Sequence, residues 1–176
     1  MARLKTRTGF IKRFARERSG ATAVEFALVA LPFFTLIMAI IEIALVFFVG
    51  TMMDNALNES AREIRTGRLQ TQGGSEESFR DELCRRVAMI SDCTLISVDV
   101  RTYENFSQTD FSSPIGAGGS FDSSGFNFTP GGPSDIVVVR AYYPMKLFLP
   151  SIGLANLPGN KRLIASATAF RNEPYQ

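Results

Sequence analysis

The sequence predicts an α+β protein in which an N-terminal transmembrane helix extends into a small exported domain with an antiparallel sheet. Three observations predict this fold. Residues 21–50 are almost entirely apolar, a narrow apolar stripe continues to about residue 65, and strand-like segments follow in the C-terminal half. The 176 residues suit one domain of ordinary size with an appended segment.

The apolar segment, residues 21–50, contains only two charged residues, Glu25 and Glu42. At about 1.5 Å per residue, residues 26–49 would form a helix about 36 Å long, enough to cross about 30 Å of hydrocarbon. Apolar residues lie all around this helix, which disfavours an amphipathic helix at the membrane surface. A buried helix of a soluble protein is the alternative, but the rest of the chain is too small to wrap it. A cleaved signal peptide fits poorly, because its apolar segment would have only ~7–15 residues.

Glu42 would lie roughly 24 Å beyond Phe26 along that helix, near the outer lipid headgroups. We expect an exposed surface acid there. A second contact in an assembly is the alternative.

The charges on either side of the apolar segment predict its orientation. Residues 1–20 form a basic leader with seven Lys or Arg and one Glu, whereas residues 50–60 contain no Lys or Arg. This asymmetry predicts a cytoplasmic N-terminus and a C-terminal domain in the periplasm or at the cell surface of a bacterium. The leader could also lie on anionic lipid, but nucleic acid is not an expected partner for so short an arm tied to a membrane.

Composition excludes many classes of site. The chain has no His and only two Cys, so it cannot form a Ser-His-Asp triad, a His-ligated metal site or a four-thiolate zinc site. We therefore expect no metal, no cofactor and no enzymatic activity. A membrane-tethered enzyme that uses Ser and Lys or paired carboxylates, such as Asp92, Asp99 and Asp135, is a further alternative, although nothing places these acids together.

A short motif precedes the apolar segment. Residues 18–26 read RSGATAVEF: a basic residue, a Gly, small or apolar residues, a Glu and then the hydrophobic helix. This order resembles the cleavage site of type IV prepilins, in which a membrane peptidase cuts after the Gly, here between Gly20 and Ala21. The AVEFALV stretch resembles the TadE family of tight-adherence (Flp) pilus proteins, as does the Glu-Pro ending of residues 167–175.

Glu25 would then be the fifth residue of the mature chain, and the resemblance implies that it aligns subunits. A glutamate costs roughly 2.5–3.5 kcal/mol at the centre of a membrane helix and less near an interface, so it needs a partner. Cleavage after Gly20 would create a cationic amine on Ala21, which could pair with Glu25 of a neighbouring subunit. Alternatively, Glu25 is an acid at the N-terminal turn, where the helix dipole favours it anyway.

Beyond residue 50 the helix is expected to continue. Apolar residues recur there at spacings of three and four, and Thr66-Gly67 provides a C-terminal cap. We therefore expect residues 51–67 to extend the membrane helix of residues 21–50, with two helices broken near Gly50 as the alternative. A long helix carrying a compact domain also fits the pilin-like lollipop that the resemblance implies.

Residues 68–176 are expected to form the exported α+β domain. Ser75 is a suitable N-cap for a second helix with one apolar face. Alternating or continuous apolar residues predict strands at residues 95–103, 136–143 and 163–170. A small antiparallel sheet packed on the helices is the simplest arrangement.

Cys84 and Cys93 are the only thiols, and both would lie outside the cytoplasm, where oxidation is favoured. We expect a disulfide between the second helix and the first strand. On one continuous helix their Cα atoms would lie roughly 13 Å apart, so the helix must end between them. A redox or metal pair is the alternative, but the C-x-x-C spacing is absent.

Residues 105–134 form a long connection rich in Gly, Ser and Phe. A connection of this length is usually functional or disordered, and the phenylalanines argue against a simple linker. They could pack on the sheet, or contact another pilus subunit or a surface.

Taken together with these features, the resemblance to the TadE family implies a structural or assembly protein, a minor pilin or pseudopilin of a tight-adherence pilus involved in pilus biogenesis and surface adhesion. The resemblance implies the inner membrane, a prepilin peptidase, other pilin subunits and the assembly machinery as partners. The major Flp pilins are much shorter, so the large exported domain favours a minor subunit. The alternative is an uncleaved single-pass periplasmic scaffold or binding module.

Overall fold

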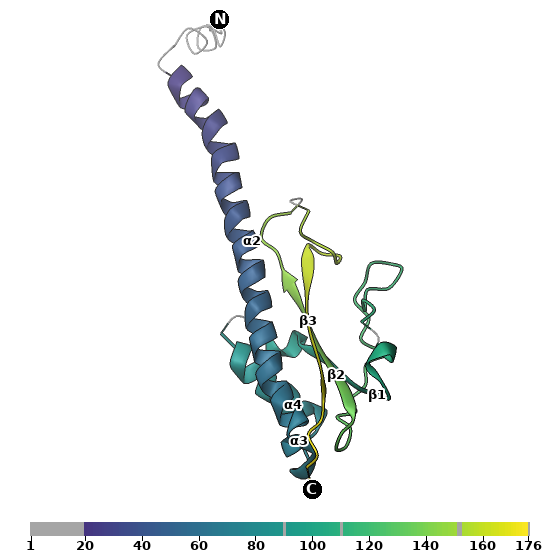
Figure 1. Ribbon diagram of the computed structural model, residues 1–176. Coiled ribbons are helices and arrows are strands. Elements are labelled where there is room, and N and C mark those ends of the chain that lie inside the picture. The colour runs from purple at the N-terminus through teal and green to yellow at the C-terminus, as the bar shows by residue number, and fades with distance from the viewer. Residues whose placement is uncertain (1–19, 90, 110, 151–152, 176) are drawn as a thin grey trace, which may run out of the picture. The chain divides into compact units, whose positions relative to one another are not determined.

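The computed structural model describes residues 20–89, 91–109, 111–150 and 153–175, so the predicted basic leader lies outside the described residues except for Gly20. The chain divides into two units, one up to Ile40 and one from Ile41 onward. The predicted α+β class is confirmed, because a long N-terminal helix is followed by short helices and a three-stranded antiparallel sheet (Figure 1).

The long helix α2 (Ala21–Arg65) is continuous, as the sequence predicts. It passes through Pro32 and Gly50 without a break, so the alternative of two helices separated near Gly50 is wrong. Gly67 follows with φ of 75°, the left-handed conformation that ends a helix and that glycine adopts without steric cost.

Two shorter helices follow, α3 (Arg68–Thr71) and α4 (Glu76–Val87). Ser75 caps α4 as predicted: its hydroxyl accepts the Ser78 amide at 3.3 Å, and the Ser78 hydroxyl accepts the Ser75 amide at 2.8 Å. This reciprocal pair satisfies two backbone donors that the helix itself leaves free. The buried face of α4 consists of Phe79, Leu83 and Val87.

The three predicted strands are present as β1 (Ser97–Tyr103), β2 (Ile136–Lys146) and β3 (Lys161–Arg171). They pair antiparallel in the order β1-β2-β3, and β2 is buried along most of its length, as a central strand should be. The first strand begins two residues later than predicted, because the short 3₁₀ helix η1 (Cys93–Leu95) precedes it.

The main hydrophobic core lies between one face of the sheet and the helices α2 and α4. Alternate side chains of β2 point toward this core, and the stripe predicted on the second half of α2 packs into it. The α2 residues of this core are Val49, Met53, Ala56, Leu57, Ala61 and Ile64. A second, smaller cluster lies on the opposite face, where Phe121 and Phe126 of the long connection pack against Tyr142.

A buried ion pair holds the two N-terminal strands together on that second face. Asp99 of β1 lies directly opposite Arg140 of β2, and the Arg140 Nε donates to the Asp99 Oδ2 at 2.9 Å. The other Asp99 oxygen accepts the Arg101 Nε at 2.9 Å and the Asn127 amide at 2.8 Å. Burial tends to lower the pKa of Arg140, but the hydrogen bond to Asp99 and nearby negative charges outweigh it and raise that pKa.

Candidate functional site

Gly20 and Ala21, which the resemblance to prepilins predicts as a cleavage site, lie at the start of α2. Gly20 directly precedes the helix, and its carbonyl accepts the Val24 amide at 3.1 Å. Gly20 and Ala21 are both exposed, and a Cβ added at Gly20 would meet no atom within 4 Å. Among the described residues, nothing therefore covers the Gly20–Ala21 peptide bond.

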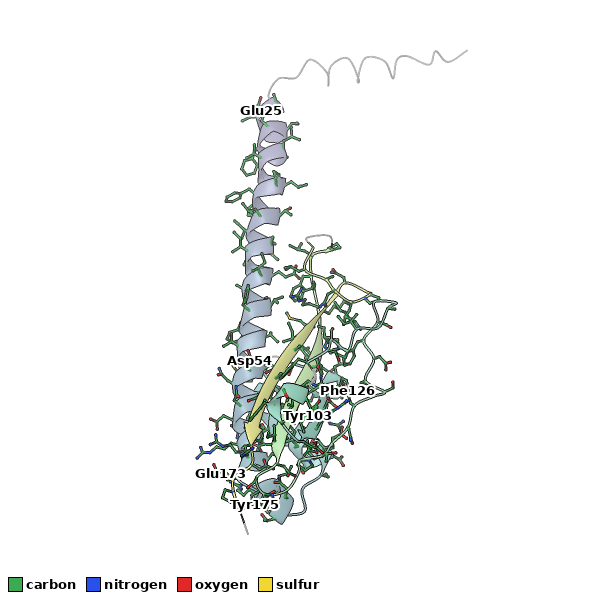
Figure 2. The ribbon with its side chains drawn as sticks, turned by 45° about the vertical axis from the view of Figure 1, so that its right-hand side comes forward. Glu25, Asp54, Tyr103, Phe126, Glu173 and Tyr175 are labelled. Atoms are coloured by element: carbon green, nitrogen blue, oxygen red, sulfur yellow. A yellow bond between two sulfur atoms is a disulfide. The ribbon has the colours of Figure 1, made fainter. Side chains whose placement is uncertain are left out.

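Glu25 lies near the N-terminal end of α2 (Figure 2). It follows Ala21 by four residues, a spacing that places both on the same side of a helix. Its side chain is exposed, and within the described ranges no residue forms an ion pair or hydrogen bond with it. An acid that lies among apolar residues and has no partner among the described residues is available to a group outside them.

The first half of α2 exposes a continuous apolar surface. Phe26, Leu31 and Phe47 are 71%, 73% and 72% exposed. Only 11% of the most apolar 18-residue stretch of the helix is buried. The helix is long and apolar enough to cross a membrane. A surface of this extent in water would aggregate, so it requires lipid or other apolar helices around it.

The predicted disulfide is present. Cys84 of α4 and Cys93 of η1 are bonded, with their Cα atoms 5.5 Å apart. The helix ends at Val87, between the two cysteines as expected, and Asp92 caps η1 by accepting the Thr94 amide at 3.0 Å. Hydrogen bonds from the hydroxyl and then the amide of Thr94 lower the pKa of Asp92.

The three acids considered for an enzymatic alternative lie in separate structural contacts. Asp99 is in the buried ion pair, Asp92 caps η1, and Asp135 accepts the Gly132 amide at 2.8 Å. Among the described residues, no group of three or more Cys, Asp or Glu is arranged to hold a metal ion.

For the long connection, residues 105–134, the structure confirms one of the two outcomes considered from its sequence, packing on the domain, for three of its phenylalanines. Phe121, Phe126 and Phe128 pack on the domain, Phe128 against Phe79 and the other two against Tyr142. The remaining two, Phe106 and Phe111, are 52% and 57% exposed. Phe106 and Phe111 are therefore the most exposed phenylalanines of the connection.

Glu42 is the residue for which the sequence prediction is wrong. We expected an exposed acid, but Glu42 is only 2% exposed. Its carboxylate accepts the backbone amides of Phe148 and Leu149, the second at 3.2 Å. The physical reason is its position on the helix. Val46 follows Glu42 by four residues and Val49 follows Val46 by three, so Glu42 lies on the same face as the stripe of α2 that packs in the core. That spacing was the signal available in the sequence.

Residues 20–62 match the family model described as TadE-like protein. The match confirms the predicted resemblance over Gly20 and nearly all of α2, and suggests involvement in the tight-adherence pilus system. Together with the apolar helix, it supports a single-pass membrane anchor. No match was found among curated proteins or solved structures.

Proposed function

We propose that this chain is a minor pilin or pseudopilin of a tight-adherence (Flp) pilus, with a structural rather than an enzymatic role in pilus biogenesis and surface adhesion. The observation that carries the proposal is the TadE-like match, which begins at Gly20 and follows an exposed apolar helix. The match therefore coincides with the segment that would be both processed and assembled.

In this proposal a prepilin peptidase cuts between Gly20 and Ala21. The open surroundings of Gly20 support this step, since a peptidase needs access to the peptide bond and glycine presents no side chain. Cleavage would leave α2 beginning with a charged amine on Ala21. Glu25, exposed one turn later, would pair with such an amine on a neighbouring subunit and fix the register between the two helices.

The apolar half of α2 then serves twice. Before assembly, it anchors the chain in the bacterial inner membrane, with the N-terminus in the cytoplasm and the domain in the periplasm. During assembly, neighbouring helices replace lipid around the same side chains, which costs little because lipid and helix surfaces are similarly apolar. The Cys84–Cys93 disulfide supports an oxidising compartment for the domain.

The intact mass of the protein, expressed with and without a prepilin peptidase, tests the proposal. We expect the peptidase to remove residues 1–20 from the wild type and to leave Gly20→Leu uncleaved. Gly50→Leu is the matched control, because Gly50 also lies in open space along the apolar segment and its substitution should not affect cleavage. A wild-type chain that keeps residues 1–20 beside an active peptidase would contradict the proposal and favour an uncleaved periplasmic scaffold.

A further inference from the structure

The connection between β2 and β3 carries apolar side chains on its surface. It lies at the end of the sheet away from α3 and the C-terminus (Figure 1). Phe148 is 71% exposed, Leu149 and Leu154 are partly exposed, and Pro150 is exposed. We call these four residues the apolar loop. The proposed function leaves them without a role.

The apolar loop contacts α2 at the level of its apolar half. The Glu42 carboxylate accepts the amides of Phe148 and Leu149. Phe48 of α2, six residues after Glu42, is still 52% exposed. At about 1.5 Å per residue, Glu42 and the Phe148 amide bound to it lie about 9 Å further than Phe48 toward the N-terminal end of the helix. If Phe48 faces lipid, the apolar loop lies deeper in the same lipid.

Several backbone groups among the described residues of this connection are paired, which suits an apolar environment, because every unpaired N–H or C=O there costs several kcal/mol. The two amides at its start are satisfied by Glu42. The Leu147 amide donates to the Asn160 carbonyl at 2.9 Å, and the Leu154 carbonyl accepts the Arg162 Nη1 at 3.1 Å. In a loop exposed to water, the two amides could donate to water molecules. In an apolar environment they need a protein acceptor, and the buried Glu42 carboxylate provides one.

Cations flank the apolar loop. Lys146, the last residue of β2, lies directly opposite Lys161, the first residue of β3. Like charges opposite each other destabilise a sheet, and none of the ion pairs within the described residues includes either lysine. Anionic lipid headgroups would compensate these charges, and lysine side chains reach headgroups readily from apolar surroundings.

We propose that the apolar loop is a second membrane contact, which inserts Phe148 into the outer leaflet of an anionic phospholipid bilayer beside α2, with Lys146 and Lys161 at the headgroups. This inference rests on the part of the proposed function in which α2 spans the membrane. Glu42 is a positioning residue that holds the loop backbone at this depth. The domain is then attached to the bilayer at two places.

The absence of tryptophan from the chain allows a direct test. Full-length F148W is reconstituted into vesicles of phosphatidylethanolamine and phosphatidylglycerol with brominated acyl chains, which quench nearby indoles. F106W is the matched control. Phe106 is 52% exposed, but it follows the end of β1 that pairs with the start of β2, whereas the apolar loop follows the end of β2. F34W reports on α2 itself, since Phe34 is 59% exposed in the apolar segment. We expect F148W and F34W to lose most of their emission and F106W to keep it.

The three variants separate the possible failures. If F34W is quenched while F148W emits as strongly as F106W, the second membrane contact is overturned and the membrane-spanning helix stands. If neither F34W nor F148W is quenched, both are overturned. The indole of F148W could instead remain unquenched by the brominated lipid and transfer energy to a labelled second copy of the chain. That result overturns the lipid contact in favour of self-association.

Two further substitutions test the roles of charge and position. Lys146→Glu in the F148W background should reduce quenching in anionic vesicles, and unchanged quenching overturns the role of the headgroups. Glu42→Ala should make F148W shallower, as judged with bromines at different acyl depths, while F34W stays unchanged. Glu42→Gln should restore much of the depth, because its carbonyl oxygen can still accept a loop amide. Equal depth in all three forms overturns the positioning role of Glu42.

Discussion

The ring of Tyr175 packs on Gly67 so closely that a Cβ added at Gly67 would lie 2.2 Å from the Tyr175 Cγ. Gly67 ends α2, whereas Tyr175 lies near the end of the chain, beside the C-terminal end of that helix (Figure 2). The Glu173 amide donates to the Arg65 carbonyl at 2.8 Å, and the Tyr175 hydroxyl donates to the Gly131 carbonyl at 3.3 Å. The C-terminal residues thus fasten the end of α2 to the sheet and to the long connection.

Gly67→Ala should destabilise the domain more than Gly73→Ala does. Both glycines have positive φ, 75° and 65°, so each substitution costs about 1–2 kcal/mol from backbone strain alone. Only Gly67 meets Tyr175, whereas Gly73 has no atom within 4 Å of an added Cβ. Thermal unfolding of the full chain in detergent should show the larger loss for Gly67→Ala, at roughly 2–4 °C per kcal/mol. Equal losses would mean that the tyrosine contact contributes nothing.

Tyr175 also predicts a loss of stability at alkaline pH. Burial, and then the negative charge of Asp135, raise the pKa of its phenol above the ordinary 10.0. The folded state therefore holds this proton more tightly than the unfolded state, and the resulting stabilisation is present below pH 10.0 and disappears as pH rises through the folded pKa. In alkaline unfolding curves, Tyr175→Phe should remove this part of the pH dependence, because it retains the ring and cannot ionise. An unchanged slope for Tyr175→Phe would assign the alkaline loss to other groups.

Asp99→Asn should be among the most destabilising substitutions in the domain. The variant removes the buried carboxylate that pairs with Arg140, and breaking a buried pair in this way costs about 3–5 kcal/mol. Glu82→Gln is the control, since it breaks the pairs with Arg85 and Arg86 on α4, each worth about 0.3–0.5 kcal/mol. Denaturant unfolding measures both. A similar small loss for the two variants would show that Arg140 finds water or another acceptor.

Loss of the Cys84–Cys93 disulfide should lower the stability by about 3 kcal/mol, because the bond closes a short loop in the unfolded chain. We expect the double variant Cys84→Ala/Cys93→Ala to unfold at a lower temperature than the wild type, and dithiothreitol to lower the wild type to a similar value. The double variant itself should not respond to dithiothreitol. Insensitivity of the wild type to the reductant would mean that the two thiols are not bonded in the isolated protein.

The parts of the fold that were predicted correctly depend on local patterns. The apolar segment and the stripe after it predict the full length of α2, and alternation predicts the strands to within a few residues. The disulfide follows because the chain offers only two cysteines. The helix and strand predictions need only the pattern of neighbouring residues, and two cysteines can form only one intramolecular disulfide.

The contacts that the sequence did not predict join residues far apart in the chain. Asp99 looked like one of several free carboxylates, because its pairing with Arg140 depends on the register between β1 and β2. Register is set by the whole sheet and not by either strand alone. The spacing of Glu42 to Val46 and Val49 indicates burial, but it does not identify the partners of Glu42, which are backbone amides more than a hundred residues later. Backbone groups carry no signal in the sequence.

Assembly provides the last prediction. If Glu25 pairs with the Ala21 amine of a neighbour, Glu25→Gln should be cleaved normally, because Gly20 and its open surroundings are unchanged. The variant should then fail to enter the pilus or its initiating complex, since the neutral amide leaves the amine without a counter-charge in a medium of low dielectric. The measurements are the intact mass and the amount of the chain that co-purifies with sheared pili.

Glu59→Gln is the matched control for this prediction, because Glu59 is an exposed glutamate on the same helix but lies beyond the apolar half. We expect it to behave like the wild type in both measurements, and Glu25→Asp to recover part of the assembly because it keeps the charge on a shorter side chain. Wild-type assembly of Glu25→Gln would limit this residue to the favourable but dispensable role of an acid at the N-terminal turn of a helix. The register between subunits would then depend on the packing of the apolar side chains alone.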